Sequence, residues 1–526
     1  MRKRWLAVLA AFLWTGCPSA TATDGRPNVV VVLADDLGFS DLGCYGGEIE
    51  TPNLDRLAAG GLRFTQFYNC AKCETTRATL LTGRYHHEVG IAKLAHAATL
   101  AEVAQQAGYT TLMAGKWHME GNPLDRGFER YFGHLSGACN YFTGDGTFRI
   151  DREVYEVPES GFYTTDANTD WAVRFLHEAP TDKPFFLYLA YNAPHYPLQA
   201  PESDVRKYLG RYRGGWDAMR SARAARQQAM GLLPHDFTPA PRPPDVPAWD
   251  SLSLAEQIEQ DLMMATYAAM VDRLDRNIGR LMAALEATGR ADNTLLLFFS
   301  DNGACPFQRT RPETREQLLL PWDPTSYWTY DKGWAHACNT PFREYKRNQH
   351  EGGIATPCIA HWPAGPGRPV IGPDFRESAE GRLTDQPAHL VDIMATLLDL
   401  AGTAYPTTIH DQPTGSPRGL SLRPILEGRV REPHPTFHFT YYGNHNALRE
   451  GDWKLVNLGN GPWELYDLAT DRTEQHDLAE THVERRDAMA ASWQQLAEEI
   501  HVPDPRSRRN GGGQQKEAKA DAILDE

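Results

Sequence analysis

The chain has 526 residues, a formal net charge of -15 at pH 7 and 41% hydrophobic residues. This length is sufficient for two or three domains with a large core. The acidic balance disfavours a nucleic-acid-binding protein, which needs a basic face, and it means that any anionic ligand must be held by a local cluster of cations or by a metal.

The N-terminus has the pattern of a secretory signal. Residues 1–22 start with basic side chains, continue with an apolar run too short for a comfortable membrane span, and end in "ATA", which fits the small-residue rule for cleavage. We therefore expect an exported protein, periplasmic or secreted, without a membrane span; lipoprotein anchoring at Cys17 is the alternative. Seven cysteines remain after cleavage, an odd number that leaves at least one unpaired.

The first part of the chain alternates strand and helix patterns. Runs rich in β-branched and aromatic residues predict four buried strands, at Asn28–Ala34, Tyr109–Ala114, Pro184–Tyr191 and Thr294–Ser300. Helical patterns cover residues 51–61, 98–108, 165–179 and, after a Ser253/Glu256 capping box, about 254–288. This alternation predicts an α/β fold with a mostly parallel central sheet sandwiched by helices.

Two segments interrupt the alternation, and the last part of the chain changes character. Residues 205–250 and 306–340 are predicted to be ordered insertions in a catalytic domain spanning residues 23–418. Short alternating strands and a closing helix predict a smaller C-terminal α+β domain, 419–502, with an antiparallel sheet, and the polar tail 503–526 is predicted to be disordered. The insertions carry aromatic side chains that either stack on an aryl group or sugar or form the insertions' own core: Trp216, Trp249, Trp322, Tyr327, Trp328 and Tyr330.

Oxygen-bearing side chains follow two of the predicted strands. Asp35 and Asp36 follow the first strand, and Asp301 and Asn302 follow the fourth. Because ligands bind beyond the carboxyl ends of the strands in open parallel sheets, we expect these side chains to converge. Such hard oxygen ligands suit Ca²⁺ or Mg²⁺ rather than zinc. The alternative is that both pairs are ordinary caps and turns, in which these dipeptides are common.

Basic side chains follow the other two strands. Lys116 and His118 lie in "GKWH", His195 ends "NAPH", and Lys346 precedes a glycine pair in "KRNQHEGG". Together they are candidates to hold a compact polyoxyanion. The alternative is two structural histidines and solvated surface lysines.

Cys73 begins a short helical run, "CETTRATLLTGR". A thiol at a helix N-terminus, four residues before Arg77, is expected to be acidified. This permits a cysteine hydrolase with His118 or His195 as base. However, thiolate nucleophiles rarely need a hard divalent cation beside them, so the predicted metal favours an oxygen nucleophile acting on a charged ester.

The chain resembles the sulfatases of the alkaline-phosphatase-like superfamily, from about residue 27 to the end of the C-terminal domain. The insertion "GWDAMRSARAARQQAMGL" is most similar to the arylsulfatase branch. The motifs that carry the resemblance occur in the family's order: "NVVVVLADDLGFSDLGCYGG", "TPNLDRLAAGGLRFTQFY", "TTRATLLTGRY", "AGKWH", "NAPHYPLQAP", "FFSDNGA" and "KRNQHEGGIATP".

The resemblance implies a role for the cysteine that the residues alone do not reveal. In that family the cysteine at this position is oxidised by a formylglycine-generating enzyme to formylglycine, whose hydrate binds Ca²⁺. The implied metal ligands are Asp35, Asp36, modified Cys73, Asp301 and Asn302. The implied catalytic residues are Cys73, Arg77, Lys116, His118, His195, Asp301 and Lys346. The chain departs from the family's modification motif at Thr75, which stands where the family has proline or alanine.

The implied activity is hydrolysis of an aryl or carbohydrate sulfate monoester to an alcohol and sulfate. Two alternatives remain open. One is a phosphate or phosphonate monoester hydrolase that uses the same site. The other is a sulfate-ester-binding protein in which Cys73 is never converted, which the departure at Thr75 keeps open.

Overall fold

The structure is a computed structural model, and it describes residues 25–233, 237–365, 375–459 and 461–503. The predicted signal sequence, the lipidation alternative at Cys17 and nearly all of the predicted tail lie outside the described residues. Among the described helices, none combines the length and the apolar character needed to cross a bilayer.

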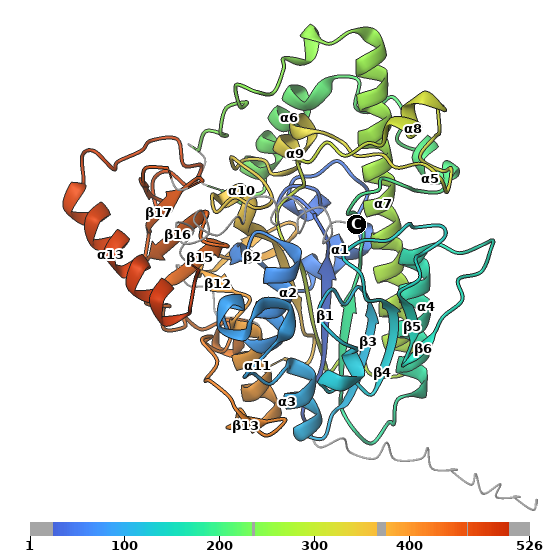
Figure 1. The fold of residues 1–526 in the computed structure, drawn as a ribbon, viewed down its shortest axis with the longest axis vertical. Coiled ribbons are helices and arrows are strands. Elements are labelled where there is room, and N and C mark those ends of the chain that lie inside the picture. Colours follow the sequence, from blue (N-terminus) through green and yellow to red (C-terminus); the bar gives the residue numbers. More distant parts are fainter. Residues whose placement is uncertain (1–24, 234–236, 366–374, 460, 504–526) are drawn as a thin grey trace, which may run out of the picture.

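The described part of the chain contains a twelve-stranded mixed sheet (Figure 1). Its central strands β1, β3, β7 and β8 run parallel, as the alternation of elements predicted. In sheet order the strands are β10 (Phe375–Ser378), β11 (Gly381–Thr384), β2 (Leu62–Tyr68), β9 (Ala355–His361), β8 (Thr294–Ser300), β1 (Asn28–Ala34), β7 (Phe185–Ala190), β3 (Thr110–Gly115), β4 (Arg130–His134), β5 (Phe148–Ile150) and β6 (Glu153–Val154), with β12 (Ala388–His389) paired to β2.

Helices cover both faces of this sheet. The helices of this domain are α1 (Pro52–Ala59), α2 (Cys73–Thr82), α3 (Leu100–Gln106), α4 (Thr164–Glu178), α5 (Glu202–Arg206), α6 (Gly215–Ala229), α7 (Leu254–Ala287), α8 (Pro312–Glu316), α9 (Lys332–Cys338), α10 (Glu351–Ile354), α11 (Asp392–Ala401) and α12 (Arg423–Leu426). The predicted capping box starts α7, where Ser253 accepts from the Glu256 N–H. Of these helices, α6 lies in the segment 205–250, and α8 and α9 lie in the segment 306–340.

The central strand β1 shows why these runs are apolar throughout. Val30 and Val32 pack in one core with Leu274 of α7, whereas Val29 and Val31 pack in the opposite core. Because side chains alternate across a strand, a strand covered on both faces requires apolar residues at every position. This packing fixes the carboxyl end of β1 at Asp35 and Asp36.

The sheet is not wholly parallel. Strand β9 runs antiparallel to both of its neighbours, β8 and β2. The sequence patterns did not identify β2 or β9 as strands, although both are almost fully buried. The short helix α10 directly precedes β9, so the chain enters that strand from the edge where the parallel strands end.

The C-terminal domain is a four-stranded antiparallel sheet covered by one helix. Its strands are β15 (Phe437–Tyr441), β16 (His445–Glu450), β17 (Trp453–Asn457) and β18 (Glu464–Asp467), and its helix is α13 (Val483–Glu499). Figure 1 shows this domain at the left of the view, whereas α7 lies at the right. The predicted α+β character is confirmed, but β16 was missed because "HNALRE" has little of the aromatic and β-branched content of its neighbours.

A buried ion network joins this domain to the segment that precedes β9. Lys454 of β17 lies 2.9 Å from Glu351 of α10 and 2.8 Å from Glu474, and all three side chains are fully buried. The Glu351 N–H donates to Glu474 over 2.8 Å. The two domains therefore share charges that neither could bury alone.

We expect Lys454→Met to destabilise the protein by about 3–5 kcal/mol, because it leaves two buried carboxylates without their shared cation. Equilibrium denaturation in guanidinium chloride measures this effect. The control is Arg152→Met, which breaks an exposed pair with Asp125 and should cost less than about 1 kcal/mol. Equal effects of the two substitutions would contradict the structural role of Lys454.

Candidate active site

Cys73 is the first residue of helix α2, as the sequence indicated. The helix ends at Gly83, whose φ of 66° lies in the left-handed region that glycine adopts readily. The side chain of Cys73 is only 2% exposed. Helix α2 therefore begins inside the protein, with its first turn at the carboxyl edge of the sheet.

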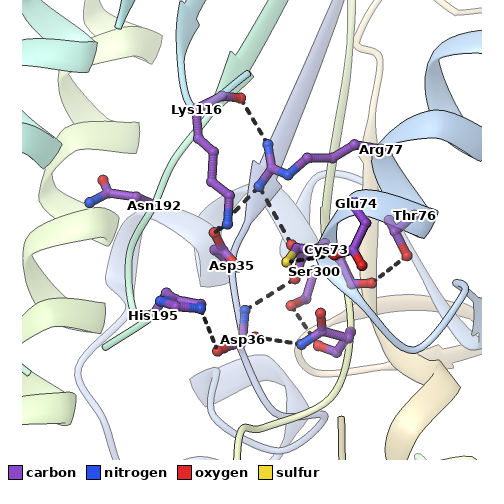
Figure 2. Close-up of polar contacts among 12 residues, drawn as sticks. Asp35, Asp36, Cys73, Glu74, Thr76, Arg77, Lys116, Asn192, His195 and Ser300 are labelled. Carbon is purple, nitrogen blue, oxygen red and sulfur yellow. Dashed lines mark hydrogen bonds and ion pairs between the residues drawn. The ribbon is translucent and has the colours of Figure 1, made fainter. Parts of the chain in front are cut away.

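The end of β1 turns both of its aspartates into the same site. Asp36 has a φ of 67°, a left-handed conformation that is uncommon outside glycine. Its backbone N–H donates to Asp301 Oδ1 over 3.1 Å, and its Oδ1 accepts from Asn302 Nδ2 over 2.6 Å. Figure 2 shows Asp35 and Asp36 on the same side of the chain, between Cys73 and His195. The two aspartate-bearing loops therefore meet, as the strand-end argument predicted.

The carboxylates also meet the sulfur. One ligand atom each of Asp35, Cys73 and Asp301 lie within 4.8 Å of one another, and the same holds for Asp35, Asp36 and His195. Asp35 Oδ1 and Asn302 Oδ1 are buried without a hydrogen-bond partner. Buried oxygens are normally satisfied, and a hard divalent cation is the partner that carboxylate and amide oxygens prefer. The residues present therefore fit a hard divalent cation.

Cations surround the carboxylates from three other segments. Lys116 Nζ lies 2.5 Å from Asp35, and Lys346 Nζ lies 2.8 Å from Asp36. Arg77 Nη2 lies 3.5 Å from both Asp35 and Asp301. Figure 2 shows Lys116 and Arg77 converging on Asp35. A tetrahedral anion entering this site would meet fixed positive charges that are already desolvated.

The two histidines enter the site by different routes. His195 Nε2 lies 3.5 Å from Asp36 Oδ2, while its Nδ1 is 2.6 Å from the Tyr196 carbonyl, which requires a proton on Nδ1. His118, with a φ of 55°, has a ring nitrogen within 4.8 Å of ligand atoms of Cys73 and Glu74. Burial lowers the pKa of both imidazoles, and Lys116 lowers that of His118 further. The neutral forms are therefore favoured in the site as it stands.

The carboxylates respond in opposite directions to their shared environment. Burial alone would raise the pKa of Asp35, but Lys116, His195 and Arg77 hold it well below its ordinary value. Burial and the adjacent Asp35 raise the pKa of Asp301. Two such carboxylates repel each other unless a further positive charge lies between them.

Burial makes Cys73 a weaker acid, contrary to our expectation. It raises the pKa of Cys73 to about 12, despite the nearby Lys116 and Lys346. The expectation of an acidified thiol was wrong because desolvation outweighs the helix terminus and the cations. As encoded, Cys73 is therefore a poor thiolate nucleophile.

Sequence reasoning missed Glu74, which follows Cys73 and is buried beside it. The Cys73 thiol lies 3.6 Å from Glu74 Oε2, and Lys72 Nζ lies 3.1 Å from Glu74 Oε1. The hydroxyl of Tyr442, from the C-terminal domain, donates to Glu74 over 2.6 Å. An acidic residue in "CETTR" was a visible signal, whereas nothing local marks Tyr442, because its contact spans 368 positions of the chain.

The aromatic residues of the insertions divide between the two roles considered. Trp216, Trp249 and Trp334 pack edge to face with ring centroids 4.9–5.6 Å apart, so they form the core of the insertions. Trp328 is also buried. Tyr330 lines a small cavity beside Asp36, together with Pro194, Tyr196, Leu198, Cys305, Phe307 and Thr329. The site wall therefore comes mainly from Tyr196, Phe307 and Tyr330, of which the sequence indicated only the last.

Comparisons with known proteins show the family to which this chain belongs. The family model "Sulfatase" matches residues 27–403. An arylsulfatase of Klebsiella aerogenes is 32% identical over 471 residues, covering 82% of this chain and 98% of the relative. An uncharacterized sulfatase of Schizosaccharomyces pombe is also 32% identical, over 488 residues, covering 83% and 86%.

Solved structures show the same fold. The structure of Ps i-CgsB in complex with k-i-k-neocarrahexaose superposes with a TM-score of 0.64 at 25% identity, covering 91% of this chain and 94% of that one. The structure of BT4656 in complex with its substrate D-glucosamine-2-N,6-O-disulfate has a TM-score of 0.62 at 25% identity, covering 91% and 99%. The chain therefore belongs to the sulfatase family of the alkaline-phosphatase-like superfamily and is a sulfuric ester hydrolase.

Proposed function

We propose that this protein is an exported sulfatase that cleaves aryl or carbohydrate sulfate monoesters at a formylglycine derived from Cys73, with one Ca²⁺ as its metal. The observation that carries the proposal is the meeting of Asp35, Cys73 and Asp301 within 4.8 Å, enclosed by buried cations. This arrangement suits the binding of a compact anion and of a hard metal ion next to residue 73.

The proposed metal ligands are Asp35, Asp36, Asp301, Asn302 and the modified Cys73. A Ca²⁺ ion held by these residues would supply a positive charge beside a sulfate oxygen, and the hydrated aldehyde at residue 73 would offer one hydroxyl for attack on sulfur and a second whose deprotonation would release sulfate. The oxygen-only donor set from Asp35 to Asn302 favours Ca²⁺, with Mg²⁺ the less favoured ion.

The surrounding basic residues are proposed to bind the sulfate and handle its protons. Lys116, Lys346 and His195, which contact Asp35 or Asp36, are proposed to bind the remaining sulfate oxygens. His195, once protonated on Nε2 as well as on Nδ1, or Lys346 beside it, is the proposed donor to the leaving oxygen. Asp301 is proposed to assist deprotonation of the attacking hydroxyl.

The remaining two catalytic residues act on Cys73 itself. His118 is proposed to remove the proton from the second hydroxyl, which its position near Cys73 supports. Arg77 is fully buried and donates to the Lys116 carbonyl over 2.9 Å, so its guanidinium is held in place to orient the modified residue.

The departure at Thr75 is compatible with the folded site. Thr75 lies in the first turn of α2, where the backbone N–H has no helical partner and proline is tolerated. Its hydroxyl donates to the carbonyls of Cys70 and Lys72, over 3.0 and 2.9 Å. Threonine therefore replaces the stiffness of proline with one hydroxyl proton shared between these two carbonyls.

The proposal is tested by the mass of the tryptic peptide that contains Cys73, produced with a formylglycine-generating enzyme. We expect a loss of about 18 Da relative to the thiol, from the covalent change alone. The same preparation should hydrolyse nitrophenyl sulfate at least about tenfold faster than nitrophenyl phosphate. An unmodified thiol with no sulfate release would support the non-converted binding protein, and the opposite rate order would support the phosphate-ester alternative.

A further inference from the structure

The unmodified Cys73 belongs to a second group of metal-binding atoms, in addition to the one that it forms with Asp35 and Asp301. One ligand atom each of Cys73, Glu74 and His118 lie within 4.8 Å of one another. This second group combines sulfur, nitrogen and oxygen. Thiolate sulfur and imidazole nitrogen are ligands of Zn²⁺, whereas Ca²⁺ takes oxygen ligands. The composition of the group therefore indicates a metal of another class than the one expected at the carboxylates.

The two oxygens of the Glu74 carboxylate have different surroundings. Oε1 accepts from the Tyr442 hydroxyl over 2.6 Å and lies 3.1 Å from Lys72 Nζ. Oε2 lies 3.6 Å from the Cys73 sulfur (Figure 2). The contacts of Oε1 orient the carboxylate, while Oε2 has the thiol, a weak donor, as its partner within the described part of the chain. Oε2 is thus held beside the sulfur and keeps lone pairs for a metal.

His118 supplies a nitrogen from a different segment, just after β3. Its Nδ1 is buried and has no hydrogen-bond partner among the described residues. A Cβ at Gly137 would lie 2.7 Å from His118 Nε2, so a glycine at that position leaves room for the ring. A buried polar atom without a partner is uncommon, and a bound ion is one of its explanations. The imidazole is therefore placed beside the sulfur with capacity to bind a metal.

The spacing and charge of these atoms suit a tetrahedral divalent ion. With a Zn–S bond of about 2.3 Å and a Zn–O bond of about 2.1 Å, the two ligand atoms of a tetrahedral site lie about 3.6 Å apart. The distance from Cys73 Sγ to Glu74 Oε2 is 3.6 Å. A thiolate and a carboxylate together carry two negative charges, which balance a divalent ion in a buried place where an unpaired charge is costly.

We propose that Cys73, Glu74 and His118 bind a divalent cation of the Zn²⁺ type in the chain as encoded, before residue 73 is converted. When the ion binds, the S–H bond breaks, a bond from Sγ to the metal forms, and the proton passes to solvent without any change of oxidation state. Conversion removes the sulfur and therefore removes this site. The inference goes beyond the proposed function and does not depend on it, because it concerns the unconverted chain.

The test uses the full chain produced without a formylglycine-generating enzyme, with Co²⁺ as a coloured probe for the Zn²⁺-type site. A thiolate bound to Co²⁺ gives a charge-transfer absorption in the near ultraviolet, which oxygen and nitrogen ligands alone do not give. We expect Co²⁺ to produce this absorption, Zn²⁺ to remove it by displacement, and excess Ca²⁺ to leave it in place. Cys73→Ser should lack the absorption, which excludes the other cysteines as its source.

Glu74→Gln and His118→Asn should each weaken Co²⁺ binding more than about tenfold, because loss of even an outer partner of a metal ligand costs roughly 10–100-fold in affinity. Asparagine is chosen at His118 because the φ of 55° there is tolerated by asparagine. The matched control is Asp301→Asn, which alters the oxygen group that shares Cys73 and should weaken Co²⁺ binding less than either of the other two substitutions.

A second measurement does not require these variants to fold. Zn²⁺ should raise the melting temperature of the unconverted wild-type protein more than that of Cys73→Ser, because a ligand that binds only the folded state stabilises it. Thermal melts of each variant without metal establish that the variants used for Co²⁺ binding are folded.

The inference is overturned if the folded, unconverted protein gives no thiolate absorption with Co²⁺, or if Zn²⁺ stabilises wild type and Cys73→Ser equally. It is also overturned if Asp301→Asn weakens Co²⁺ binding as much as Glu74→Gln and His118→Asn do, since the metal would then lie among the carboxylates. None of these results bears on the proposed sulfatase function, which the converted enzyme and nitrophenyl sulfate decide separately.

Discussion

Cys73→Ser is expected to lower multiple-turnover sulfatase activity by at least ~10³-fold, the scale on which loss of a nucleophile acts. A serine has a single hydroxyl, so it can attack sulfur once but has no second hydroxyl whose deprotonation would release the bound sulfate. Serine is close to cysteine in size, and Cys73 is buried without a disulfide, so the fold should survive. Steady-state hydrolysis of nitrophenyl sulfate, with a thermal melt of the same sample, measures both effects.

Cys70→Ser is the matched control for this substitution. Cys70 is also buried, and its thiol lies 3.3 Å from the Thr79 hydroxyl, a contact that serine can keep. We expect this variant to retain turnover. Should Cys73→Ser keep most of the wild-type rate, the formylglycine mechanism would be wrong, whatever the control shows.

Asp301→Ala is expected to abolish turnover and also the stabilisation of the protein by Ca²⁺. In wild-type protein, Ca²⁺ at about 100 times its Kd should add about 2.7 kcal/mol to the free energy of unfolding, because it binds only the folded state. The variant loses a ligand beside Asp35 and Cys73 and the acceptor of the Asp36 N–H. Thermal melts with added Ca²⁺ and with a chelator give the difference directly.

This readout separates a metal ligand from a structural carboxylate. In the absence of metal, Asp301 crowds a second carboxylate, which offsets part of the cost of leaving the Asp36 N–H without its acceptor, so the deciding quantity is the shift of the melt on adding Ca²⁺ rather than the melt of the chelated protein. Asp452→Ala, which removes a carboxylate that is 65% exposed, should keep the full response to Ca²⁺. A chelator-insensitive melt of the wild-type protein would remove calcium from the proposal.

Chain order and local patterns were sufficient to predict the parallel core and much of the site. Continuous apolar runs identified β1, β3, β7 and β8, because a strand covered on both faces requires mostly apolar residues. Since parallel strands end at one edge, the residues after them had to converge, and Asp35, Lys116, His195 and Asp301 do meet there. These predictions needed only the residues next to each strand.

Tertiary packing alone decided the remaining features. The direction of β9 and the contact of Tyr442 with Glu74 depend on segments hundreds of residues apart. The acidity of Cys73 depends on how completely other elements exclude water from it, which no local motif encodes. The sequence by itself determined which groups reach this edge of the sheet, because the position at which a strand ends is encoded by neighbouring residues. The fold decided the solvation and the partners of those groups, because desolvation and Coulomb interactions act through space between segments distant in the sequence.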